Sequence, residues 1–314
     1  MTKFIFKRML QLIPVLLLVG IVVFTIVRLI PGDPAVVMLG PEATTVEIAM
    51  MRESLGLDKP IIFQMGTWFL NALHGDFGSS YYYKMPVTSL ILSRLEPTLL
   101  LMLLGLLISI FIGIPIGIIS AINHNKFLDR FSIIFSMLGI SIPNFWLGLM
   151  LILFFSQKLQ ILPAIGYIPI DEGNLLNTLK YLVLPALTLG LQKASETARL
   201  TRSSMLEVLR ADYIRTAKAK GLAYRIVVMK HALKNAMVPT LTGIGMNIAH
   251  LAGGAVVTEA VFNIPGAGSL IVLAISRRDY SLIQGHIMYV ALMFVIVNLI
   301  IDILYKIFDP RVEY

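Results

Sequence analysis

Five stretches of the chain contain no Lys, Arg, Asp or Glu, and each is long enough to cross a lipid bilayer. They are Met9–Val27, Pro97–Asn123, Phe131–Gln157, Asn235–Thr258 and Tyr280–Ile301. About 20 predominantly apolar residues are needed to span the hydrocarbon core as a helix. A weaker sixth run begins near Tyr181 and must pass Lys193. The pattern predicts an all-α membrane protein with six transmembrane helices.

The polar segment between the first two runs, residues 31–96, is long enough to form structure of its own. Thr44 and Glu47 have the spacing of a capping box, and Gly56 follows as a stop signal, which predicts one short helix. A second helix is expected to begin at Pro60, with one face formed by Ile61, Met65, Trp68 and Ala72. We expect both amphipathic helices to lie over the outer mouth of the protein.

Positive charge is unevenly distributed between the loops. The segment from Arg199 to Lys234 contains nine Lys and Arg residues and only two acids, Glu207 and Asp212. The loops on the opposite side contain Lys158, Lys180, Arg277 and Arg278. Because cytoplasmic loops carry an excess of Lys and Arg, both termini are expected in the cytoplasm.

The first apolar run follows Lys3, Lys7 and Arg8, as a signal peptide would, but it continues into Arg28 without a small-residue cleavage site. We therefore interpret it as a retained span. The expected organisation is a cytoplasmic N-terminus with the first span, an extracytoplasmic loop, a core transmembrane domain with a basic cytoplasmic loop, and a cytoplasmic tail. The corresponding ranges are 1–30, 31–96, 94–306 (basic loop 199–234) and 307–314, of which the start of the core near residue 94 is implied by a family resemblance of the whole chain.

The composition agrees with a membrane protein, since 57% of the residues are hydrophobic and only 14% are charged. The absence of cysteine excludes a disulfide framework and a cysteine nucleophile. There is no glycine-rich phosphate loop and no zinc-binding His-Glu-x-x-His pair, so the chain itself is expected to bind no ATP, cofactor or metal. We attribute the net charge of +8 to the cytoplasmic loops rather than to nucleic-acid binding.

Two different classes of function remain as alternatives. Gly139-Ile-Ser141-Ile resembles the serine motif of intramembrane proteases, with His250 or His286 as the histidine base that such an enzyme requires. An ion-coupled secondary carrier requires buried charge, for which Lys193, Glu259 and Asp302 are the candidates. For Glu259 we favour simple packing or interfacial pairing over a place on a substrate path.

Glycine and proline occur within most of the apolar runs. Examples are Gly113, Pro115, Gly117, Pro143, Pro185, Pro239, Gly253 and Gly254. Small residues permit close contact between helices, and interrupted helices accompany transport pathways. The sequence leaves both interpretations open.

The basic cytoplasmic segment has a further pattern. Residues 209–221 read as a short helix that contains Ala211, Ala217 and Ala219 and is closed by Gly221. Small side chains allow such a helix to enter a cleft of another protein, whereas an ordinary positively charged loop needs no ordered helix. We interpret the segment as a docking surface.

This segment resembles the EAA loop of ABC-importer permeases, whose short coupling helix fits a groove of the ATPase subunit. Arg215-Thr216-Ala217 stands where the family has Glu-Ala-Ala, and Gly221 matches the glycine of the motif. The resemblance implies that the ATPase-coupling residues are Ala211, Asp212, Tyr213, Arg215, Thr216, Ala217, Ala219 and Gly221.

The chain as a whole resembles the first of the two paired permeases of the dipeptide and oligopeptide permease family. The matching phrases are Ile30-Pro-Gly-Asp-Pro-Ala35, Leu55-Gly-Leu-Asp-Lys-Pro60, Gly75-Asp-Phe-Gly78, Ser141-Ile-Pro-Asn-Phe-Trp146, Leu162-Pro-Ala-Ile-Gly-Tyr167, Glu259-Ala-Val-Phe-Asn-Ile-Pro-Gly266, Arg278-Asp-Tyr280 and Asp309-Pro-Arg311.

The resemblance implies a type I ABC-importer fold in the bacterial cytoplasmic membrane. It also implies a second homologous permease, two ATP-binding subunits that hold ATP and Mg²⁺, and an extracytoplasmic substrate-binding protein. The cargo of such importers is a dipeptide or oligopeptide, glutathione, or nickel and metal chelates. Glu259, Asn247 and Ser141 are the candidates for lining the translocation path.

Overall fold

The structure is a computed structural model, and it describes residues 2–29, 32–40 and 42–308. The chain divides into two compact units. Unit 1 comprises Met1–Leu95 and Ser269–Leu299, and unit 2 comprises Glu96–Gly268 and Ile300–Tyr314.

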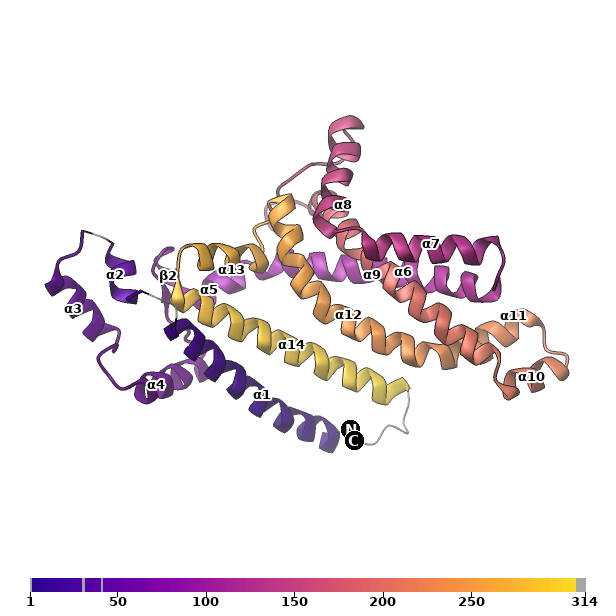
Figure 1. Cartoon of the computed structure of the whole chain (residues 1–314), viewed down its shortest axis with the longest axis horizontal. Coiled ribbons are helices and arrows are strands. Elements are labelled where there is room, and N and C mark those ends of the chain that lie inside the picture. Colours follow the sequence, from indigo (N-terminus) through magenta and orange to yellow (C-terminus); the bar gives the residue numbers. More distant parts are fainter. Residues whose placement is uncertain (1, 30–31, 41, 309–314) are drawn as a thin grey trace. The chain divides into compact units, whose positions relative to one another are not determined.

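Unit 1 contains the helices of the N-terminal third, a two-stranded hairpin and most of the last two helices (Figure 1). The elements are α1 (Thr2–Leu29), α2 (Pro34–Leu39), α3 (Thr45–Ser54), α4 (Ile61–Leu73), β1 (Ser79–Ser80), β2 (Met85–Pro86), α5 (Val87–Ser93), α13 (Ala267–Ser276) and α14 (Tyr280–Phe308). The strands pair in antiparallel fashion, Ser79 with Pro86 and Ser80 with Met85.

The two short helices expected in the polar segment are present. Thr44 caps α3 with a complete capping box, because its hydroxyl accepts from the Glu47 N–H while the Glu47 carboxylate accepts from the Thr44 N–H. Pro60 precedes α4, and α4 leaves Ile61 exposed but half-buries Trp68. The hairpin and α2 have no counterpart in the sequence-based expectation.

The core of unit 1 joins the outer end of α1 to the chain's last helices. Val27 packs in one apolar cluster with Val87, Leu90 and Ile91 of α5, and with Leu270, Ala274, Leu282 and Ile283. The buried carboxylate of Asp279 accepts hydrogen bonds from Ser80 Oγ at 2.5 Å and from the Tyr82 N–H at 3.4 Å. The hairpin is thereby fixed to the turn that precedes α14.

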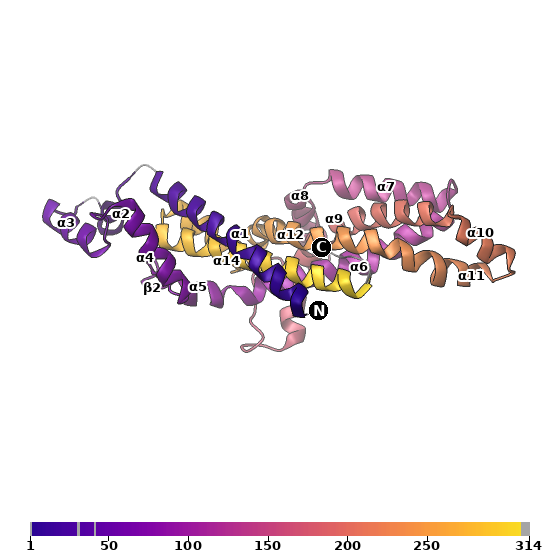
Figure 2. The ribbon, with the colours of Figure 1, turned by 90° about the horizontal axis from the view of Figure 1, so that it is seen from below.

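Unit 2 is a bundle of long helices with a short helical excursion at one end (Figures 1 and 2). Its elements are α6 (Leu95–Ile122), α7 (Phe127–Ser141), α8 (Asn144–Leu151), the π-helix η1 (Ile152–Lys158), α9 (Leu175–Leu209), α10 (Asp212–Ala219), α11 (Tyr224–Ile226), the π-helix η2 (Val227–Ala232) and α12 (Leu233–Phe262). α9 is the central helix, since it contacts both α7 and α12.

Small residues set the distance between α6 and α9. A Cβ atom added at Gly113 would lie 2.7 Å from the Ala194 carbonyl oxygen, and one added at Gly117 would lie 2.6 Å from the Ala198 carbonyl oxygen. Real Cβ atoms do not approach so closely, so the two backbones touch because these positions lack a side chain. This is the packing mode of membrane helices, in which apolar lipid provides no hydrophobic drive for association.

Among the described residues, three helical segments have the length and composition of a membrane span: Arg8–Leu29, Leu95–Ile122 and Tyr280–Leu299. Two bent pairs also qualify when each is taken together. Phe127–Ser141 with Asn144–Lys158 turns by 103°, and the second pair is Ala255–Phe262 with Ala267–Ser276. α9 is not among them, so the number of six spans stays a prediction.

Proline interrupts the helices less often than the sequence suggests. α6, α9 and α12 run continuously through Pro115, Pro185 and Pro239. A break occurs at Pro143, where Ile142 is extended because a residue before proline avoids the helical region. The uncharged run 131–157 is therefore not one straight helix.

The two compact units are a different kind of division from the expected domains, which stay a prediction. One limit between the units falls at Leu95, and residues 269–299 group with the N-terminal segment. The cause is the shared apolar cluster of α5, α13 and α14. Most of the expected tail 307–314 lies outside the described residues.

Candidate coupling surface and translocation residues

α10 forms in the basic segment where the sequence predicts a short helix. Ala211 is its N-terminal cap residue, and Asp212 in the first turn and Lys218 in the last turn complement the helix dipole. Gly221 follows with a backbone φ of 77°, a left-handed conformation that favours glycine. The predicted glycine stop is therefore confirmed by the backbone geometry.

One face of α10 packs against the rest of unit 2. Ile214 and Ala217 are buried in an apolar cluster with Met205 of α9, Val227, Val228 and Ala232 of η2, and Ala236 of α12. Ala217, only 7% exposed, thus fills a place in this chain's own core. The expectation that its small side chain faces a partner needs correction, because the helical periodicity puts Ala217 on the same face as Ile214.

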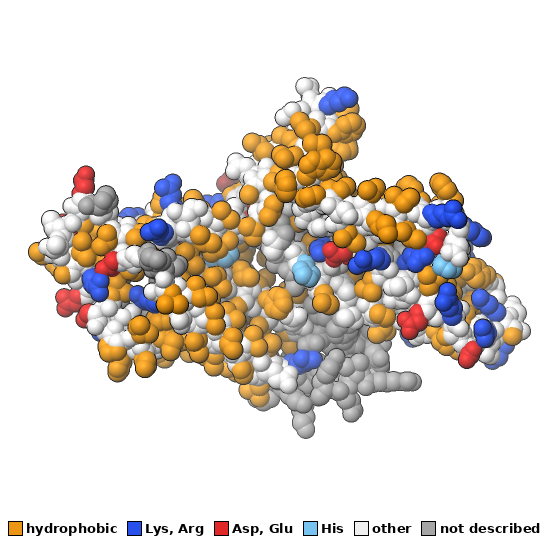
Figure 3. Space-filling view, viewed as in Figure 1, with side chains coloured by type: hydrophobic (Ala, Val, Ile, Leu, Met, Phe, Trp, Pro, Cys, Tyr) orange, Lys and Arg blue, Asp and Glu red, His pale blue; other side chains and the backbone are white. Residues whose placement is uncertain are grey.

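The other face of α10 is open to solvent. Asp212, Tyr213, Arg215, Thr216, Ala219 and Gly221 are exposed. Tyr213 Oη accepts a hydrogen bond of 2.8 Å from Asn235 Nδ2, and Lys218 Nζ lies 5.7 Å from the centre of the Tyr224 ring. Lys and Arg side chains gather over the end of unit 2 that carries α10 and α11 (Figure 3). The exposed face is consequently a basic, ordered surface.

A buried ion pair joins the first turn of α7 to α9. Asp129 is 1% exposed, and its two carboxylate oxygens accept from Arg202 Nε at 2.6 Å and Arg202 Nη2 at 2.9 Å. Ser120 Oγ donates to the same carboxylate at 2.6 Å, and the Asn125 N–H donates at 2.8 Å. A bidentate, fully hydrogen-bonded pair of this kind holds a carboxylate inside a protein at little net cost.

Sequence reasoning did not select Asp129. One feature of the sequence could have pointed to this residue, because Asp129 is the single acidic residue between residues 97 and 170. An isolated acid beside a membrane span needs a basic partner, and Arg202 lies 73 positions further along the chain. The pairing depends on the fold and could not be read from local spacing.

The three candidates for the translocation path occupy different settings. Glu259 is completely buried, and its carboxylate accepts a hydrogen bond of 2.6 Å from Thr98 Oγ1, which itself accepts from the Ala267 N–H at 2.8 Å. Glycine at positions 266 and 268 leaves the space that the carboxylate occupies. This arrangement favours packing at the bend after α12 as the role of Glu259.

Asn247 is also buried, at the centre of unit 2. Its Nδ2 lies 3.3 Å from Thr197 Oγ1, which in turn is 2.9 Å from Ser109 Oγ. The three side chains connect α12, α9 and α6 by a short polar chain. A polar contact between helices is expected where apolar surroundings offer no other partner.

Ser141 is exposed at the end of α7 and lines a groove of about 380 Å³. Serine side chains at positions 120, 132 and 136 line the same groove, together with Arg199 and Arg202. His250, one of the two histidines considered as a protease base, is exposed on α12, and no hydrogen bond of the described residues joins it to Ser141. Of the three path candidates, Ser141 is the one that is open to solvent.

The loop before α9 is fixed to the start of α6. Tyr167 Oη donates a hydrogen bond of 2.6 Å to Glu96 Oε1, and the Ile170 N–H donates to the same oxygen at 3.0 Å. Burial, together with this hydrogen bond, raises the pKa of Tyr167 above its ordinary value. The phenol is therefore a permanent donor at physiological pH.

The fold of the chain is the type I fold of ABC-importer permeases. The fold is shared with one chain of a structure described as inward facing conformations of the MetNI methionine ABC transporter, with a TM-score of 0.56 and 17% identity. That likeness covers 70% of this chain and 96% of the other. An amino acid ABC transporter with histidines gives a TM-score of 0.52 at 14% identity, over 72% and 95% of the two chains.

This chain belongs to the family of binding-protein-dependent transport system inner membrane components. The model of that family matches residues 113–314, and the model of its N-terminal part matches residues 1–102. The chain is 43% identical to a probable peptide ABC transporter permease protein, y4tP, of Sinorhizobium fredii. It is 42% identical to the glutathione transport system permease protein GsiC of Salmonella typhimurium and 41% identical to that of Escherichia coli K12. Each match covers 100% of both chains.

Proposed function

We propose that this chain conducts short peptides or closely related solutes through the bacterial cytoplasmic membrane as one permease of an ABC importer. It would act with a second homologous permease, two ATP-binding subunits that hold ATP and Mg²⁺, and an extracytoplasmic substrate-binding protein. Relatives named as peptide and glutathione permeases over the full length support this cargo class. Metal chelates are the alternative cargo.

The observation that carries the proposal is the two-sided character of α10. Ile214 and Ala217 fix the helix to α9, η2 and α12, while Tyr213, Arg215 and Thr216 remain exposed. A helix that is rigidly attached to long helices on one side and open on the other transmits a push from a partner to the bundle. We therefore assign α10 and Gly221 as the element that couples ATP binding in the partner subunits to movement of this chain.

Orientation is part of the same proposal. With both termini in the cytoplasm, α10 lies on the cytoplasmic side, where ATP is available, and α2 to α4 lie on the opposite side. The nine Lys and Arg residues between Arg199 and Lys234 support this orientation through the distribution of charge in the loops.

The proposal is tested by isolating the tagged chain in mild detergent, identifying the proteins that accompany it by mass spectrometry and measuring ATP hydrolysis in the eluate. Recovery of a second permease and ATP-binding subunits, with vanadate-sensitive hydrolysis, is the expected result. Reconstitution of that complex with its binding protein then measures ATP-dependent uptake of trialanine into vesicles. Uptake of a solute by the isolated chain in ATP-free vesicles would refute the proposal.

A further inference from the structure

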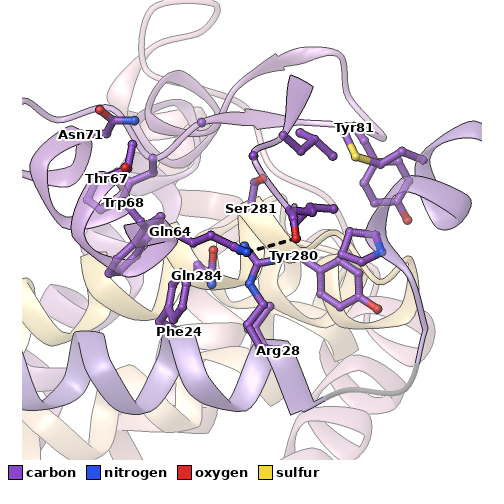
Figure 4. A pocket seen from close by; sticks show the side chains of 18 of the residues that line it. Phe24, Arg28, Gln64, Thr67, Trp68, Asn71, Tyr81, Tyr280, Ser281 and Gln284 are labelled. Atoms are coloured by element: carbon purple, nitrogen blue, oxygen red, sulfur yellow. Dashed lines mark hydrogen bonds between the residues drawn. The ribbon is translucent and has the colours of Figure 1, made fainter. Parts of the chain in front are cut away.

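Unit 1 contains a cavity of about 280 Å³ between α1, α4, the hairpin segment and the start of α14 (Figure 4). Aromatic side chains form much of its wall, and polar side chains come from three different helices. Arg28 of α1 extends toward Gln64 of α4, with Gln284 of α14 nearby (Figure 4). Ligand pockets in proteins measure roughly 300–1,000 Å³, so the cavity suits a small solute and not a protein segment.

Four residues that line the cavity each carry one buried side-chain polar atom that has no hydrogen-bond partner among the described residues. The four atoms are Arg28 Nε, Gln64 Oε1, Trp68 Nε1 and Tyr280 Oη. Buried polar groups are normally satisfied, and each unsatisfied group costs on the order of 1–3 kcal/mol. The concentration of four such atoms around one cavity indicates that a ligand completes the site.

The side chains that carry these atoms are held in place by the protein. The Arg28 guanidinium lies over the Phe24 ring, 5.2 Å from its centre, and the Phe24 ring lies 6.0 Å from that of Trp68. Gln64 uses its amide N–H groups on the backbone carbonyls of Lys59 and Leu57, at 2.7 Å and 3.3 Å. Its oxygen is therefore left as an acceptor. Tyr280 is only 8% exposed.

The unpaired atoms define the ligand that they can bind. Arg28 Nε and Trp68 Nε1 are donors, and the positive charge of Arg28 favours an anionic acceptor with two oxygens, such as a carboxylate. Gln64 Oε1 needs a donor, which the N–H group of a peptide or an amine supplies. Lys59 and Asp76 add one charge of each sign to the wall.

We propose that this cavity is a binding site for the free carboxylate end of a short peptide, with Arg28 and Trp68 donating to the carboxylate and Gln64 accepting from a peptide N–H. The choice of a peptide rests on the function proposed above, whereas the carboxylate chemistry follows from the cavity itself. A site at this place gives the permease a solute-binding step of its own, in addition to the one in the substrate-binding protein.

The chain offers a direct reporter for this site. It contains two tryptophans, Trp68 and Trp146, so the Trp146→Phe variant has its single indole in the wall of the cavity. The full-length variant in phosphatidylcholine nanodiscs is titrated with trialanine and with trialanine amide, which lacks the carboxylate. We expect a saturable change of Trp68 emission with trialanine, and at least roughly tenfold weaker binding of the amide because a charge-assisted hydrogen bond is lost.

Arg28→Gln should remove the response to trialanine, while Arg52→Gln provides the matched control. Arg52 is also a cation of unit 1, but it pairs with Asp33 and does not line the cavity. The comparison of peptide with amide uses the unaltered cavity, so it does not depend on the folding of the Arg28 variant. Equal binding of the two compounds, or no response in a folded, monodisperse sample, would overturn the proposal.

Two further arms separate the carboxylate from phosphate chemistry. The titration is repeated with inorganic phosphate and in nanodiscs that contain phosphatidylglycerol. An emission change of the same size in these arms would mean that the cavity recognises phosphate or a lipid headgroup, which contradicts the proposal. If the assembled importer takes up trialanine but Trp68 does not respond, this inference fails while the proposed function stands.

Discussion

At the scale of single residues, charge pairing and backbone conformation determine what each position tolerates. Asp129 can be charged inside unit 2 because Arg202, Ser120 and the Asn125 N–H together occupy its carboxylate. Gly221 can end α10 because a glycine has no Cβ that would clash at positive φ. Both positions yield quantitative expectations.

Replacing Arg202 by glutamine should destabilise the protein strongly. The change leaves the Asp129 carboxylate buried without its cation, and breaking a buried pair in this way costs about 3–5 kcal/mol. The measurement is the thermal unfolding midpoint of the purified chain in detergent. Arg130→Gln is the control, because Arg130 is the exposed neighbour of Asp129. Equal midpoints for the two variants would show that the ion pair contributes little.

Replacing Gly221 by valine should impair coupling, whereas asparagine should be tolerated. A β-branched side chain at a φ of 77° costs roughly 1–2 kcal/mol, while asparagine visits this region more easily. No atom lies within 4 Å of the added Cβ, so strain and not collision causes the effect. The measurement is ATP hydrolysis by the assembled importer in the presence of peptide. Variants are compared at equal amounts of protein inserted in the membrane. Unchanged stimulation in the valine variant would argue against coupling through this turn.

At the scale of elements, the two faces of α10 differ: one packs against the rest of unit 2, and the other is exposed to solvent. α10 and α3 were both expected from the sequence, because capping residues and glycine stops are local signals. Which face of α10 is buried was not readable, because the partners of Ile214 come from α9, η2 and α12. Residue spacing alone gives a helical face but not its orientation.

Leucine substitutions at the two alanines of α10 should separate these tasks. Ala217→Leu places three extra carbon atoms in the cluster around Ile214, and overpacking of this kind costs about 1–3 kcal/mol. Ala219→Leu adds the same atoms to an exposed position and should leave the unfolding midpoint unchanged. We expect Ala219→Leu instead to reduce stimulated ATP hydrolysis in the complex. A lower midpoint for Ala219→Leu than for Ala217→Leu would reverse the assignment of the faces.

The start of α3 should depend on pH. The hydrogen bond from the Thr44 N–H and that from the Thr44 hydroxyl lower the pKa of Glu47 below its ordinary value. A lowered pKa in the folded state means that the cap stabilises α3 above the pKa of the unfolded chain. This contribution is lost as the pH falls through the folded-state value.

Hydrogen exchange of the full chain measures this effect. We expect the protection of the Thr44 and Glu47 amides, corrected for intrinsic rates, to fall between about pH 5 and pH 3. In Glu47→Gln, the amide oxygen still accepts from Thr44 but does not titrate, so protection should be independent of pH. A pH-dependent loss of equal size in the glutamine variant would assign the effect to another group.

At the scale of the whole molecule, the proposed orientation makes α10 cytoplasmic and α3 extracytoplasmic. Because the chain contains no cysteine, single substitutions report this without background. Glu53→Cys and Lys218→Cys place one thiol on each exposed helix. A membrane-impermeant maleimide added to intact spheroplasts should label position 53 only, and inverted vesicles should show the opposite pattern. Labelling of position 218 in intact spheroplasts would invert the topology.

The number of spans is a second property of the whole molecule. Uncharged runs predicted most of the long helices, since only apolar side chains are stable in lipid. The 103° bend at Pro143 and the polar character of α9 were not apparent from run length. α9 combines Lys193 and Glu196 as an ion pair of 2.9 Å with a small-residue face toward α6. The depth of α9 in the membrane therefore depends on how much of its polar surface the surrounding helices cover.

The sequence by itself determined the class of the protein, the apolar runs, the capped helices and the basic segment that contains α10. These are properties of consecutive residues, and hydrophobicity, capping and glycine stops act over a few positions. Only the tertiary structure decided that Ala217 faces inward, that Glu259 is sealed by Thr98, that Asp129 finds Arg202, and that Arg28, Gln64, Trp68 and Tyr280 surround one cavity. Each of these depends on side chains from different helices, and their relative placement is fixed by packing across the fold rather than by spacing along the chain.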